Sequence, residues 1–256
     1  MYAAPRRVDR PQHNRVMVQV LAVSDEVDDG LCADVRAVRG AELILACGDL
    51  PFDYLDYLMN ALDVPLVFVP GNHDPDLTGY TASRAGLVLR AGLPVSASWP
   101  SGAINADGRV VDVLGMRVAG LGGCLRYSTG PNQYSERQQA RRARALKARA
   151  DWQRLRGAPA VDVLLTHAPP YGVGDGDGDD PPHRGFRTLH GLAARLRVPL
   201  LLHGHVHPYG LKNSDLSMGG TTVRNVVGRH VFEIDATPAG RRVYTDSRAG
   251  NGVSES

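Results

Sequence analysis

The chain has 256 residues, of which 43% are hydrophobic and 22% are charged. This composition is that of a globular protein with a sizeable core, and it excludes a disordered chain. Lysine and arginine (29 together) nearly balance aspartate and glutamate (27 together). The resulting net charge of +2 argues against a dedicated nucleic-acid-binding protein. No apolar run approaches the ~18 residues of a membrane-spanning helix.

Both ends of the chain are polar, and we expect flexible tails at 1–15 and 246–256 around a single domain at 16–245. The N-terminal stretch lacks the apolar core of a secretory signal. The three cysteines are odd in number and widely spaced, so they predict no disulfide framework and no Cys-x-x-Cys metal site. These features favour a cytoplasmic protein, and they leave its oligomeric state open.

Short apolar runs alternate with polar loops along the chain, and the runs end in Asp, Asn, His or Gly. In chain order, strands are predicted at 16–23, 41–50, 64–74, 116–123, 161–170 and 198–207, then within 221–235 and at 241–246. Helices are predicted at 52–62, from Ser135 to about Leu155, and at 186–196. Ser135 and Gln138 have the spacing of a capping box. This layout is typical of an α/β protein with ligands at the carboxyl ends of its strands.

Five polar motifs stand at the ends of the predicted strands: Asp25, Gly48-Asp49, Gly71-Asn72-His73-Asp74, His167 and Gly204-His205-Val206-His207. Their carboxylates, amide and imidazoles form the mixed oxygen and nitrogen set that binds divalent and transition metals. Two positions separate His205 from His207, so both imidazoles point the same way if the backbone is extended. A carboxylate shared by two ions would hold them roughly 3.5–4 Å apart, as in-line displacement at phosphorus requires.

The ordered set GD, GNHD, an isolated TH and GHxH resembles the calcineurin-like metallophosphoesterase superfamily over about residues 16–237. The resemblance implies a four-layer α-β-β-α sandwich of two mixed sheets flanked by helices. It also implies a metal-dependent hydrolase of phosphoester bonds, in which metal-activated water attacks phosphorus in line. The expected substrate is a phosphorylated small molecule or a phosphodiester, and phosphomonoesterase and phosphodiesterase activity both remain open.

The resemblance also implies metal ligands. Asp49 would bridge two ions. One site would be completed by Asn72, His167 and His205, and the other would use Asp25 and His207. The expected cofactor is one or two divalent transition metal ions, and Mn, Fe, Zn and Ni all remain open.

The histidine of GNHD has a separate implied role. His73 would stand beside the scissile phosphate, as general acid for the leaving group or as a charge stabiliser. Asp74 would orient His73.

One motif departs from the family pattern, because the usual Asp-x-His reads Asp25-Glu26-Val27, and valine has no ligand atom. The Asp25 site could therefore be weak. Water or another side chain could instead replace the ligand; Glu26 is nearest in sequence, but it points to the opposite face of an extended backbone. The third alternative is a binding scaffold on a catalytically weakened phosphoesterase fold.

Two loops could contact a substrate. The Gly-rich stretch 120–136 contains Arg126, which could pair with phosphate oxygens or simply belong to a structural loop. The Gly/Asp/Pro stretch 172–182 leads to His183 and Arg184, which could form a lid over the site or a solvated loop. His183, or a loop aspartate among Asp175, Asp177 and Asp179, could also supply the missing ligand.

Overall fold

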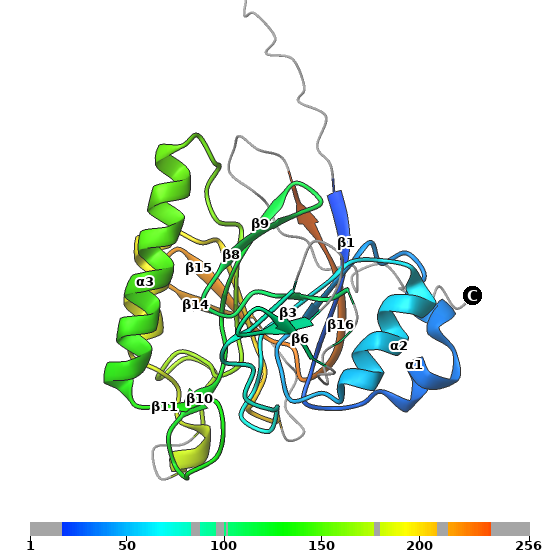
Figure 1. Ribbon diagram of the computed structural model, residues 1–256, viewed down its shortest axis with the longest axis horizontal. Coiled ribbons are helices and arrows are strands. Elements are labelled where there is room, and N and C mark those ends of the chain that lie inside the picture. Colours follow the sequence, from blue (N-terminus) through cyan, green and yellow to red (C-terminus); the bar gives the residue numbers. More distant parts are fainter. Residues whose placement is uncertain are drawn as a thin grey trace, which may run out of the picture.

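The computed structural model describes residues 17–82, 88–95, 100, 102–176, 180–208 and 215–236. The predicted tails, the strand expected at 241–246, and Asp177 and Asp179 lie outside the described residues. Two mixed sheets pack face to face, with helices on their outer faces (Figure 1). None of the described helices combines the length and the apolar character needed to cross a membrane.

The first sheet contains five strands, in the spatial order β16 (Gly228–Asp235), β1 (Met17–Ser24), β2 (Leu43–Ala46), β3 (Leu66–Phe68) and β7 (Ile104–Asn105). Strands β1, β2, β3 and β7 are parallel, and β16 pairs antiparallel with β1. The sequence predicts β1, β2 and β3 because parallel strands buried on both faces are nearly continuous runs of Val, Ile and Leu.

The second sheet contains six strands, in the spatial order β14 (Leu216–Met218), β15 (Thr221–Asn225), β13 (Leu200–His203), β12 (Val163–Thr166), β9 (Met116–Leu121) and β8 (Val110–Val113). The four inner strands are parallel, and β14 and β8 are antiparallel partners at the two edges. The carboxyl ends of β9, β12 and β13 therefore lie at one edge of this sheet.

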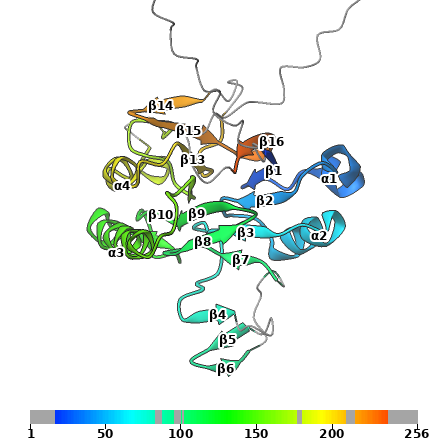
Figure 2. The same cartoon turned by 90° about the horizontal axis from the view of Figure 1, so that it is seen from above.

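Helices form the two outer layers. The first sheet carries α1 (Asp29–Ala33) and α2 (Phe52–Leu62), and the second carries α3 (Glu136–Leu155) and α4 (Thr188–Leu196) (Figure 2). Short 3₁₀ helices occur as η1 (Val35–Val38) and η2 (Pro181–His183). This arrangement confirms the predicted four-layer sandwich.

Side chains alternate between two cores along each strand, as the two-residue period of a strand requires. On β1, Val20 enters the core between the sheets, whereas Leu21 packs on the side of α1 and α2. On β12, Leu165 enters the core between the sheets, whereas Leu164 packs under α3 and α4. The rigid double sheet that results is the support for the loops at the strand ends.

Helix α3 begins where its capping box predicts. The Ser135 hydroxyl accepts from the backbone N–H of Gln138, and the Gln138 side chain accepts from the N–H of Ser135 at 2.8 Å. Helix α4 begins at Thr188 rather than at 186, because Phe186 is buried and forms a bridge with Pro170.

Several short strands were not predicted. Strands β4 (Tyr80–Ala82), β5 (Val88–Arg90) and β6 (Leu93–Pro94) form a small sheet that stands away from the sandwich beyond β7 (Figure 2). Strands β10 (Cys124–Leu125) and β11 (Gln133–Tyr134) pair in parallel within the Gly-rich stretch 120–136. These segments are too short to show a clear alternation of apolar and polar residues.

Candidate active site

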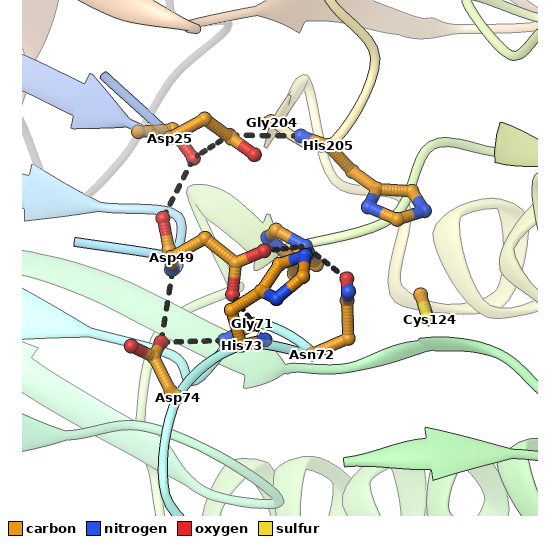
Figure 3. Close-up of polar contacts among 12 residues, drawn as sticks. Asp25, Asp49, Gly71, Asn72, His73, Asp74, Cys124, Gly204 and His205 are labelled. Atoms are coloured by element: carbon orange, nitrogen blue, oxygen red, sulfur yellow. Dashed lines mark hydrogen bonds and ion pairs between the residues drawn. The ribbon is translucent and has the colours of Figure 1, made fainter. Parts of the chain in front are cut away.

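The polar motifs of the sequence meet at the carboxyl ends of strands from both sheets. Asp25 follows β1, Asp49 follows β2, and Asn72 follows β3 in the first sheet. His167 follows β12 and His205 follows β13 in the second sheet. The loops from the two sheets face each other across one space (Figure 3).

Three of these residues adopt a backbone conformation that non-glycine residues seldom adopt. The φ angles of Asp25, Asp49 and His205 are 62°, 57° and 69°, in the left-handed region. Such a conformation costs of order 1–3 kcal/mol at each residue. It is held by backbone N–H donors: Asp25 donates to the Gly48 carbonyl at 3.1 Å, and His205 donates to Asp25 Oδ2 at 2.9 Å. Backbone strain of this kind concentrates at functional sites.

The tightest cluster contains ligand atoms of Asp49, His167 and His205 within 4.8 Å of one another. His167 Nε2 lies 3.2 Å from Asp49 Oδ2 and 2.9 Å from Asn72 Oδ1. His167 Nδ1 lies 2.8 Å from the Cys47 carbonyl oxygen. If Nδ1–H donates to that carbonyl, the lone pair of Nε2 faces two oxygen atoms. Three lone-pair-bearing atoms facing one spot fit a divalent cation.

His205 has a similar arrangement. Its Nε2 lies 2.7 Å from the carbonyl oxygen of Pro182, so a proton on Nε2 leaves the Nδ1 lone pair free. The ring centroids of His167 and His205 are 4.7 Å apart. Each imidazole therefore has one nitrogen on a backbone carbonyl and one available as a ligand, which is the usual pattern of metal-binding histidines.

The charges of the cluster depend strongly on each other. Burial lowers the pKa of His167, but the hydrogen bond and negative charge of Asp49 outweigh it and raise the pKa to about 9. Burial raises the pKa of Asp49, but His167 outweighs it and the net shift is downward. Burial and the His167 charge lower the pKa of His205 to about 3. His205 is therefore neutral near pH 7, which is the form that binds metals. His167 with a pKa of about 9 is protonated near pH 7, so a metal ion that binds Nε2 must displace that proton.

Asp74 fixes the loops around the cluster. Its Oδ2 accepts from the backbone N–H groups of Gly71 at 2.7 Å and Asp49 at 2.9 Å. The exposed His73 donates its own backbone N–H to Asp49 Oδ1 at 2.8 Å. The Asp74 carboxylate thus holds the backbone of the two loops together, and its expected role in orienting the His73 imidazole stays a prediction.

Asp25 and His207 are not part of the tight cluster. Asp25 Oδ2 accepts from the Ser24 hydroxyl at 2.6 Å, and His207 Nδ1 lies 2.9 Å from Glu26 Oε1. The backbone at Asp25 is left-handed rather than extended, so the condition under which Glu26 would point to the opposite face is not met. The carboxylate of Glu26 reaches the GHVH motif, while the Val27 side chain is exposed.

The candidate substrate residues occupy two places. Arg126 donates to the Gln133 carbonyl and to Gln138 Oε1, each at 3.1 Å, so other protein groups hold its guanidinium. His183 and the half-buried Arg184 lie in and beside η2. The His183 ring is 5.4 Å from that of His205, and its Nδ1 is 2.5 Å from Asp180 Oδ2.

The structure adds residues that sequence reasoning did not assign. Asn132 donates to the carbonyl oxygens of Gly71 at 2.9 Å and Asp74 at 3.0 Å, which fixes the GNHD loop. The Tyr127 hydroxyl accepts from Asn72 Nδ2 at 3.1 Å. Both residues lie in the Gly-rich stretch 120–136, which has no motif of its own to signal them.

A hollow of about 460 Å³ adjoins the cluster on the side of His73. Its walls come from the loop after β2, the start of α2 and the GNHD loop. The lining residues are Asp49, Leu50, Pro51, Phe52, Asp53, His73, Asp74 and Pro75. Among the lining residues that the structure describes, His73 is the only one with a basic side chain.

Glycine is required where the loops touch. A Cβ atom added to Gly71 would lie 2.1 Å from Asp49 Oδ1 and 2.7 Å from His167 Cε1. We therefore expect Gly71→Ala to displace Asp49 and weaken divalent metal binding roughly 10-fold or more, as loss of ligand-orienting contacts does. Calorimetric titration with Mn²⁺ measures this. Gly191→Ala, where nothing lies within 4 Å, is the control. Equal affinities in both variants would contradict the expectation.

Comparison with known proteins identifies the family. The family model for calcineurin-like phosphoesterases matches residues 20–209, and the chain belongs to this family. An uncharacterized protein from Haemophilus influenzae is 31% identical over 187 residues, which cover 64% of this chain and 72% of that protein.

Solved structures show the same fold. The crystal structure of TT1561 of Thermus thermophilus matches with a TM-score of 0.52 at 17% identity, and covers 91% of this chain and 100% of that one. Another crystal structure matches with a TM-score of 0.57 at 14% identity, over 90% of this chain and 99% of that one.

Proposed function

We propose that this chain is a metal-dependent hydrolase that cleaves phosphoester bonds. The observation that carries the proposal is the placement of Asp49, Asn72 and His205 around His167, in a member of a phosphoesterase family. The substrate class is a phosphorylated small molecule or a phosphodiester. The three cysteines are free, which supports a reducing, cytoplasmic setting.

Asp49, Asn72, His167 and His205 would hold one divalent transition metal ion, and Mn, Fe, Zn and Ni all suit such a ligand set. When bound, the ion lowers the pKa of a water molecule and neutralises charge on the phosphoryl group. Asp25 and His207 would serve a second ion next to the first.

His73 would act on the leaving group. Its imidazole is exposed at the hollow, and its backbone is tied to Asp49. As the bond from phosphorus to the leaving oxygen breaks, His73 donates a proton to that oxygen. The hollow would receive the alcohol half of the substrate. Since His73 is the only basic side chain among the described residues of its lining, the hollow favours an uncharged alcohol over a polyanionic one.

The η2 loop would cover the metal cluster on the side of His205. The ring centroid of His183 is 5.4 Å from that of His205, and His183 and its neighbour Arg184 would contact a bound phosphoryl group. Arg126 would have to leave Gln133 and Gln138 to do the same.

Glu26 would take the place of the imidazole that Val27 lacks, because its carboxylate already reaches His207. We expect a Mn²⁺ titration to show two steps and Glu26→Gln to weaken only the second, by roughly 10-fold. Val27→His should restore that step in the Glu26→Gln background. Asp29→Asn, which changes the exposed acid at the start of α1, is the control.

If Glu26→Gln changes neither step, Glu26 does not fill the position. Val27→His alone should then tighten the second site, because that site would be short of a ligand.

The direct test of the proposed function is hydrolysis. The purified protein is stripped of metal, reloaded with Mn, Fe, Zn or Ni, and assayed on aryl phosphomonoesters and phosphodiesters. We expect hydrolysis that a chelator abolishes and added metal restores. Metal binding without turnover of any substrate would favour the binding-scaffold alternative instead.

A further inference from the structure

The hydroxyl of Tyr127, from the Gly-rich stretch 120–136, contacts Asn72 at the edge of the candidate site. It accepts a hydrogen bond from Asn72 Nδ2 at 3.1 Å. The other end of the same amide, Asn72 Oδ1, lies 2.9 Å from His167 Nε2. Asn72 is only 4% exposed, so its amide has two fixed contacts, one on each side. Tyr127 thereby keeps the oxygen of Asn72 directed toward the cluster.

The Tyr127 hydroxyl also keeps a proton for another partner. A phenol oxygen that accepts from an amide still has its own O–H to donate. Tyr127 is 41% exposed, whereas Asn72, His167 and His205 below it are buried. A phenol ordinarily has a pKa of about 10, so this hydroxyl has its proton to donate near neutral pH.

The loop holds Tyr127 in place. The backbone N–H groups of Tyr127 and Ser128 both donate to Gln133 Oε1, at 3.2 and 2.9 Å. Gln133 Nε2 donates to the Ser128 hydroxyl at 2.8 Å, and the Gln133 side chain is buried. The Arg126 N–H donates to the Tyr134 carbonyl across β10 and β11. A donor fixed in this way loses little freedom when a ligand binds.

We propose that Tyr127 donates a hydrogen bond to a phosphoryl oxygen of the substrate while its oxygen orients the Asn72 amide. The inference rests on the proposed function. A hydroxyl that donates to a charged oxygen forms one of the stronger kinds of hydrogen bond. Tyr127 is therefore a substrate-binding residue through its proton and a positioning residue through its oxygen.

The experiment compares inorganic phosphate binding to Mn²⁺-loaded wild type and Tyr127→Phe by calorimetry, with Mn²⁺ affinity measured separately. We expect phosphate to bind roughly 10- to 100-fold more weakly to the variant, as loss of a hydrogen bond to a charged group implies. Mn²⁺ affinity should fall less. Tyr134→Phe, the same chemical change in the next strand, where the ring stacks on Arg142, should bind phosphate as wild type does.

The outcomes separate the two proposals. Equal phosphate affinity in wild type and Tyr127→Phe would overturn the role of Tyr127. An equal loss of Mn²⁺ and phosphate affinity would leave only the positioning role and overturn the contact with substrate. If wild type binds no phosphate, or binds it equally without metal, the proposed function itself fails. Thermal unfolding of each variant confirms that it is folded.

Discussion

Replacing His167 by alanine is expected to remove the metal and abolish hydrolysis. His167 Nε2 faces both Asp49 Oδ2 and Asn72 Oδ1, and no other imidazole lies between these oxygens in the described cluster. Since losing an outer-shell partner already costs 10–100-fold in metal affinity, we expect loss of this ligand to cost at least ~100-fold. Elemental analysis of the purified variant and a hydrolysis assay measure the two effects.

The matched control is His190→Ala, which removes an exposed histidine of α4 outside the cluster. It should keep metal and rate. Because His167 is buried, circular dichroism must show that the alanine variant is folded. A folded His167→Ala protein with full metal content and an unchanged rate would refute the assignment of this residue.

Replacing His73 by alanine is also expected to cost turnover, but this variant should retain its metal. His73 contacts Asp49 only through its backbone N–H, which alanine keeps, and its imidazole is exposed at the hollow. A general acid typically contributes ~10²–10⁴-fold to the rate. We expect kcat to fall by roughly that factor for esters of poor leaving groups.

The dependence on leaving group identifies the role of His73. If the imidazole protonates the leaving oxygen, aryl esters with acidic phenols should lose much less rate than alkyl esters. An equal loss for both would show charge stabilisation instead. Loss of metal from His73→Ala would contradict the separation of His73 from the metal ligands.

Most of the sandwich could be predicted from the sequence, because its strands are continuous apolar runs and α3 carries its own cap. The apolar runs that contain Val20, Leu45 and Leu165 are long enough to be recognised as strands, and each is followed by one of the polar motifs. The sheet β4–β6 could not be predicted, because its strands are two or three residues long and its exposed Leu93 gives no core pattern.

The motif residues of the candidate site could also be predicted, but not their local geometry. An extended backbone would point Glu26 to the opposite face. The backbone at Asp25 is left-handed instead, and the carboxylate of Glu26 lies against His207. Tyr127 contacts Asn72 across 55 positions of sequence, a contact that only the folded loop creates. Contacts between side chains of different loops leave no periodic pattern in the sequence, so they cannot be predicted from it.

Anomalous X-ray diffraction from crystals grown with Mn²⁺ tests the central claim most directly, because it locates the ion independently of turnover. We predict a manganese peak within bonding distance of Asp49, Asn72, His167 and His205. A crystal in which manganese binds elsewhere, or in which these four side chains keep only their contacts to one another at saturating Mn²⁺, would contradict the assignment of this cluster as the metal site.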